Sequence, residues 1–181
     1  MGLIDTIASI VPGVSEPTGH LNFKNRLMWT SIILLLFLSL SQVVLYGVAP
    51  VTLERFQFFE LILGSSIGSL LTLGIGPILT ASIILQLLIA SKIIPIDTKT
   101  VEGKKQYQGI QKIAVIFFCI FEAWAYVAFG AIVPISADPG IFMLLIVQIA
   151  FGGFLVLLMD EVIQKWGIGS GVSMFIAAGV K

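Results

Sequence analysis

The sequence contains little charge and few reactive side chains. Charged residues make up 11% of its 181 residues, and it has one cysteine, Cys119, and one histidine, His20. A single cysteine excludes an internal disulfide, and a formal net charge of zero gives no electrostatic reason to expect a direct nucleic-acid partner. The sequence also lacks a His-Glu-x-x-His pair, and Gly74-Ile75-Gly76 lacks the third glycine of a dinucleotide fingerprint. We therefore expect no metal site and no cofactor.

A catalytic site is equally hard to place. Gly169-Ser170-Gly171 superficially suggests a serine nucleophile within the membrane. Such a serine needs a general base beside it, but His20 lies in an N-terminal polar linker with no apolar segment to carry it there. We predict that the chain has no catalytic residue and is not an enzyme.

Hydrophobic residues are abundant: they make up 57% of the chain, and the mean hydropathy is +1.07. This composition is typical of a membrane protein. Residues 27–48, 113–132 and 141–159 are each apolar and long enough to cross a bilayer as a helix. Residues 1–26 predict a short amphipathic helix on the membrane surface, followed by a polar linker. The sequence thus predicts an all-α, polytopic membrane helix bundle over residues 27–181.

The longest apolar run, Phe56 to Ser91, is interrupted near its middle by Gly74-Ile75-Gly76-Pro77. As one helix, its 36 residues would extend roughly 54 Å, whereas the hydrocarbon core of a bilayer is about 30 Å thick. Two full crossings do not fit either, because Ile78 to Ser91 has 14 residues and a perpendicular span needs about 20. Irregular backbone at membrane depth is tolerated only where protein surrounds it or where it lines a water-filled cavity. Gly74, Gly76 and Pro77 therefore favour a break that lines a conduit over a simple kink.

Basic residues are distributed unevenly between the two sides of the predicted spans. Eight of them share one side, and Arg55 lies on the other. The eight are Lys24, Arg26, Lys92, Lys99, Lys104, Lys105, Lys112 and Lys165. The positive-inside rule makes the first side cytoplasmic, together with the N-terminus. The broken run must then cross only once in total, so we predict a re-entrant helix at about 57–70 that enters from outside and a short span at 77–91.

Several candidate residues have two interpretations that the sequence leaves open. Ile75 and Leu79 share one helical face, as do Val172 and Ile176, but such pairs face lipid more often than a pore. Glu122 lies in the middle of an apolar span, where a charge costs on the order of 3 kcal/mol. It is either a functional residue or a protonated acid that only packs.

Half of a secondary transporter is the alternative function, because transporters also use helices that are broken at mid-membrane. Their binding sites have convergent polar or charged groups near the break. Leu71 to Leu79 offers only Thr72, and this favours a channel.

Two long stretches of the sequence, Leu73 to Leu88 and Leu158 to Gly179, resemble the signature regions of the SecY family of protein-conducting channels. The similarity extends over roughly residues 20 to 181, and the Gly-Ile-Gly-Pro turn followed by Thr80 is similar to archaeal rather than bacterial members. The family has ten transmembrane helices in two pseudo-symmetric halves. The resemblance therefore implies that this chain is the N-terminal half, with a fifth span that begins at 171–181.

The resemblance also implies roles for three groups of residues. The re-entrant helix would be a plug, a ring of aliphatic side chains would form the narrowest point, and the helices at 77–91 and 113–132 would form one side of a lateral gate. The plug would contain Phe58, Phe59, Glu60, Leu61, Ile62, Leu63, Gly64, Ser65, Ser66, Ile67 and Gly68. The pore ring would contain Ile75, Leu79, Val172 and Ile176, and the gate would contain Thr80, Ile84, Leu87, Phe118 and Glu122.

By the same resemblance, the expected partners are SecE, the small β subunit, the translating ribosome and the C-terminal half of the same channel. Signal sequences, nascent polypeptide and membrane lipid would be the molecules that it handles. The expected location is the plasma membrane.

Overall fold

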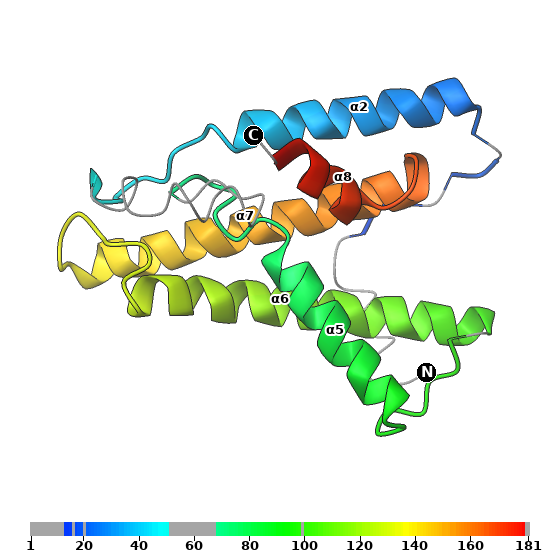
Figure 1. Cartoon of the computed structure of the whole chain (residues 1–181). Coiled ribbons are helices and arrows are strands. Elements are labelled where there is room, and N and C mark those ends of the chain that lie inside the picture. Colours follow the sequence, from blue (N-terminus) through cyan, green and yellow to red (C-terminus); the bar gives the residue numbers. More distant parts are fainter. Residues whose placement is uncertain (1–12, 16, 20, 51–67, 99, 180–181) are drawn as a thin grey trace.

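The computed structural model describes residues 13–15, 17–19, 21–50, 68–98 and 100–179 (Figure 1). The predicted N-terminal amphipathic helix and nearly all of the predicted plug lie outside these residues. Within them, the regular structure is helical apart from two isolated β-bridges, which confirms the predicted all-α fold. The helices are α2 (Phe23–Leu40), α5 (Gly76–Ala90), α6 (Val101–Ala128), α7 (Pro139–Trp166) and α8 (Gly171–Gly179).

Helix length separates full spans from shorter pieces. Among the described helices, α2, α6 and α7 are long and apolar enough to cross a membrane. α6 and α7 have 28 residues each, and at about 1.5 Å per residue their ends extend beyond a hydrocarbon core of about 30 Å. α5 is apolar but has only 15 residues. It therefore has the half-length expected for the second part of the broken apolar run.

The bundle is built around α6 and α7, which lie side by side (Figure 1). α2 packs against α7, α8 contacts both α2 and α7, and α5 crosses α6 obliquely. One apolar cluster contains residues from all five helices: Phe37, Ile78, Val115, Val156 and Phe175. The two short helices, α5 and α8, are thus attached to the same core.

The predicted end of the first span, 27–48, is wrong, because α2 ends at Leu40. The following segment, residues 41–49, contains turns and two isolated bridge residues, and polar contacts hold it to other parts of the chain. The N–H of Leu45 donates to the carbonyl of Gly68, and the side chain of Gln148 bonds to both the N–H and the carbonyl of Tyr46. Tertiary partners satisfy this backbone, so the apolar sequence does not need to remain helical.

The helices α6 and α7 do not share their ends with the predicted spans 113–132 and 141–159. α6 already begins at Val101, and α7 continues to Trp166. The predicted spans include only the apolar residues, but lysine and glutamate are good helix formers and can extend a helix past the membrane surface. At its other end, α6 stops at Ala128, before Gly130 turns the chain with a φ of +74°.

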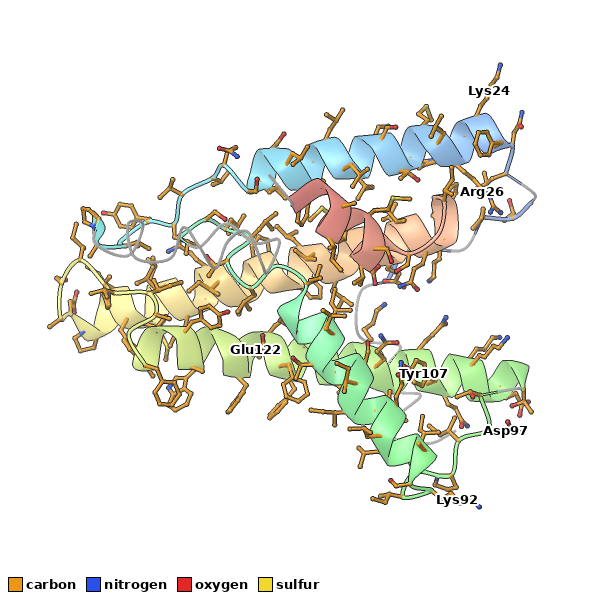
Figure 2. The ribbon with its side chains drawn as sticks, in the orientation of Figure 1. Lys24, Arg26, Lys92, Asp97, Tyr107 and Glu122 are labelled. Carbon is orange, nitrogen blue, oxygen red and sulfur yellow. The ribbon has the colours of Figure 1, made fainter. Side chains whose placement is uncertain are left out.

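Several of the cations used for the topology prediction lie at one end of the bundle. Figure 2 shows Lys24, Arg26 and Lys92 at the same end as Tyr107 near the start of α6. Lys112 and Lys165, from α6 and α7, also meet there on Glu161. The fold is therefore compatible with the predicted charge distribution, and the cytoplasmic location of this end stays a prediction.

Candidate functional site

The backbone that leads into α5 is irregular and lies inside the protein. Residues 71–75 are buried, and Gly74 has a φ of +51°, a conformation that glycine adopts without steric cost. The hydroxyl of Thr72 donates to the carbonyl of Ser69 at 2.5 Å and accepts the N–H of Gly68 at 3.1 Å. Neighbouring groups of the protein thus satisfy the polar backbone, which is the condition for irregular structure at membrane depth.

Contacts to α7 and to the segment after α2 hold this break in place. The N–H of Leu70 donates to the carbonyl of Val43 at 2.8 Å, and Ser69 pairs with Val44 in a β-bridge. A Cβ on Gly152 of α7 would overlap the Leu70 carbonyl. The predicted plug helix was expected to extend to Leu70. That expectation is wrong for its last residues, because 68–70 form a turn and a bridge instead.

The three residues that predicted the break have different local roles. Gly74 makes the turn, and α5 begins at Gly76 with Pro77 at its start, where a missing N–H costs nothing. A Cβ on Gly76 would lie 3.1 Å from a carboxylate oxygen of Glu122 on α6. The glycine therefore lets the start of α5 approach α6 closely.

The four predicted pore-ring residues divide into two pairs. Ile75 is 6% exposed and belongs to the five-helix apolar cluster, and Val172 of α8 packs against the same cluster. Leu79 and Ile176, one helical turn further along α5 and α8, are 39% and 44% exposed. Each short helix thus brings one aliphatic side chain to the shared core and one to a surface that the described residues leave partly exposed.

The predicted gate residues lie on α5 and α6. The hydroxyl of Thr80 forms a hydrogen bond with the carboxylate of Glu122, whose position in the C-terminal half of α6 is seen in Figure 2. Ile84 and Leu87 are exposed on α5, whereas Phe118 packs against the apolar cluster.

A second polar contact joins the same two helices, and the sequence does not predict it. The amide of Gln111 donates to the hydroxyl of Ser82 at 2.8 Å. Polar residues within or beside apolar runs were the available signal, but their pairing depends on the angle at which α5 crosses α6. The two hydrogen bonds join α5 to α6 at two levels.

A charged cluster near the end of α7 is not predicted from the sequence, because the predicted span ends at 159. The carboxylate of Glu161 lies 2.9 Å from Lys112 of α6 and 2.8 Å from Lys165. Lys165 also donates to the carbonyl of Val14, and the indole N–H of Trp166 donates to that of Ser15. The cluster therefore connects α6, α7 and the segment that precedes α2.

The glycine-rich turn between α7 and α8 is fixed by α2. The hydroxyl of Thr30 accepts the N–H of Ile168 at 3.0 Å, and it would lie 2.8 Å from a Cβ on Gly167. This close approach explains the glycine at position 167. Ser170 is exposed in this turn. Among the described residues, no group of His, Cys, Asp or Glu side chains has the arrangement of a metal site.

Comparison with known proteins identifies similar chains over nearly the whole length. The SecY family model matches residues 69–181. The protein translocase subunit SecY of Methanothermobacter thermautotrophicus is 44% identical over 176 residues, which cover 97% of this chain and 38% of that protein. This chain therefore spans about two fifths of the length of that relative.

Solved structures agree with this similarity. One described as "Sec61 in the Canine ribosome-channel complex from the endoplasmic reticulum" has a TM-score of 0.86 and 40% identity, over 99% of this chain and 41% of that chain. Another concerns the plug domain of SecY, which is said to stabilise the closed state of the translocation channel and to maintain a membrane seal. It has a TM-score of 0.84 and 39% identity, over 98% of this chain and 40% of that one.

Proposed function

This chain belongs to the SecY family, and we propose that it supplies the N-terminal half of a channel that passes unfolded polypeptides across the membrane and releases apolar segments sideways into lipid. A relative with 44% identity is named a protein translocase subunit, and this chain corresponds to 38% of its length. The remainder of the channel would come from a C-terminal half. The chain would act as a passive conduit, without catalysis of its own.

One observation carries this proposal: two short helices, each preceded by a glycine-rich turn, place aliphatic side chains on one shared core. Ile75 and Val172 meet at this core, while Leu79 and Ile176 are exposed beside it. Branched aliphatic side chains offer no hydrogen bonds to water, so a ring of them resists ion leakage by dewetting and can yield to many different polypeptides. The missing half would complete the ring.

The same geometry supports a lateral gate along α5 and α6. Ile84 and Leu87 present an apolar surface on α5, and an emerging apolar segment can move along such a surface into lipid. The bond between Thr80 and Glu122 and the bond between Ser82 and Gln111 join α5 to α6. The two helices would therefore move together as one side of the gate.

The proposed plug and the proposed partners are inferred from the related proteins. Residues 58–68 would close the outer side of the pore, as the plug domain of the related SecY is said to maintain a membrane seal. A ribosome would deliver the polypeptide and supply the driving force, as suggested by the related ribosome-channel complex. SecE and a small β subunit would complete the assembly, in the plasma membrane and with the N-terminus of this chain in the cytoplasm.

The secondary transporter is less well supported. A transporter of this kind needs unsatisfied polar groups near the break to hold its substrate. Thr72 precedes the break, and both its donor and its acceptor capacity are used by the neighbouring backbone. The carboxylate of Glu122 lies against Gly76 of the break and is bonded to Thr80 of α5.

A chimera tests the proposed function. Residues 1–181 replace the matching segment of the Methanothermobacter thermautotrophicus relative, and the product is reconstituted in vesicles with the partners of that relative. We expect the chimera to translocate a signal-bearing polypeptide at a rate within an order of magnitude of the unmodified relative. A chimera that assembles to the normal level but translocates nothing would refute the proposal.

A further inference from the structure

Asp160 is a buried carboxylate at the end of α7, with 3% of its surface exposed. Its Oδ1 accepts the N–H of Val172 at 3.1 Å, and its Oδ2 accepts the amide N–H of Gln164 at 2.7 Å. The ion pairs of the described residues nearby involve Glu161 rather than Asp160. The carboxylate of Asp160 is therefore directed at the first turn of α8 and not at the lysines.

The start of α8 is pressed directly against this carboxylate. A Cβ on Gly171 would lie 2.5 Å from Oδ1 and 2.8 Å from the Cα of Asp160. Figure 1 shows that α8 begins where the turn after α7 folds back toward the bundle. The first N–H groups of a helix lack partners within the helix, and a carboxylate at that point satisfies them and interacts favourably with the helix dipole.

Two contacts then fix the position of α8. Asp160 holds its first turn, and Phe175 is fully buried and stacks on Phe37 of α2 with ring centroids 4.6 Å apart. Val172 takes part in the contact with Asp160, and Ile176 is the residue directly after Phe175. A change at either contact would shift or rotate the short helix and move both side chains.

We propose that Asp160 is a positioning residue that sets the height and rotation of α8, and thereby the place of Val172 and Ile176 in the pore ring. This inference rests on the proposed function, because it gives Asp160 a consequence for ion leakage rather than for stability alone. Asp160 touches no transported polypeptide and acts only through α8.

The test uses the chimera and three variants. Asp160→Ala removes the hydrogen bonds to Val172 and Gln164, and Asp160→Glu keeps the charge but is longer by one methylene. Asp138→Ala is the matched control, because Asp138 is an exposed carboxylate that accepts an N–H at the start of α7 rather than α8. The resting ion conductance is measured in planar bilayers at equal amounts of assembled channel. Crosslinking from Ile176→Cys to a stalled polypeptide is measured in parallel.

We expect Asp160→Ala to raise the resting conductance several-fold and to lower the crosslinking yield. Asp160→Glu should change both in the same direction but less, and Asp138→Ala should leave both unchanged. If Asp160→Ala does not assemble, the comparison is made with Asp160→Glu. Conductance equal to that of the unmodified chimera, or an equal rise in Asp138→Ala, would overturn the role of Asp160. Failure of the unmodified chimera to translocate would instead refute the proposed function.

Discussion

Single glycines decide how closely separate parts of the backbone approach one another in this protein. Gly152 of α7 faces the carbonyl of Leu70, and Gly76 of α5 faces the carboxylate of Glu122. Both contacts involve groups near the break, one on each side of it. A side chain at either position would push the break away from the long helices that hold it.

The substitution Gly152→Ala tests this close approach. The new Cβ would overlap a backbone carbonyl that cannot move freely, and overpacking of this kind costs about 1–3 kcal/mol. We expect the midpoint of thermal unfolding of the chimera in detergent to fall by several degrees. Gly140→Ala is the matched control in the same helix, because its Cβ would meet its nearest atom at an ordinary 3.4 Å. Equal midpoints for the two variants would contradict the contact.

Some of these residues could be identified from the sequence and others could not. Gly74, Gly76 and Pro77 stand out because they interrupt an apolar run whose length fits neither one span nor two. The hydrogen bond between Asp160 and the start of α8 has no such signal, since it depends on a tight turn between two helices. Sequence spacing does not give the direction of that turn.

At the scale of helices, the sequence predicts which helices form better than it predicts where each helix begins and ends. The half-length of α5 follows from its apolar window and the glycines before it. The first turns of α6 and the last turns of α7 contain charged residues. A span predicted from hydrophobicity alone stops at such residues, although they favour a helical backbone. The early end of α2 depends on Gln148 and Gly68, which are distant in sequence.

The predicted plug gives a test at this scale. We expect replacement of residues 58–67 of the chimera by a Gly/Ser linker of equal length to raise the resting ion conductance in planar bilayers. The replacement stops before Gly68, because residues 68–70 hold the break through their bonds to the segment after α2. Polypeptide translocation by the same variant is the control for assembly. An unchanged conductance in a variant that still translocates would contradict the plug assignment.

The described part of the chain has exposed aliphatic side chains beside its apolar core. Its apolar cluster holds five helices together, yet Leu79 and Ile176 remain exposed beside it. A membrane protein can leave such residues against lipid or against another part of a larger assembly. The chain spans about two fifths of the length of its relative, and this favours contact with another part of a larger assembly over contact with lipid.

The most direct test of the central claim, that this chain lines a polypeptide channel, asks what Leu79 touches during translocation. Leu79→Cys is introduced into the chimera together with Cys119→Ala, and a polypeptide with one cysteine is stalled in transit. Leu35→Cys on α2 is the control, because Leu35 is even more exposed, at 66% compared with 39% for Leu79. We predict a disulfide crosslink from position 79 and none from position 35. A stalled polypeptide that never crosslinks to position 79 would contradict the pore assignment.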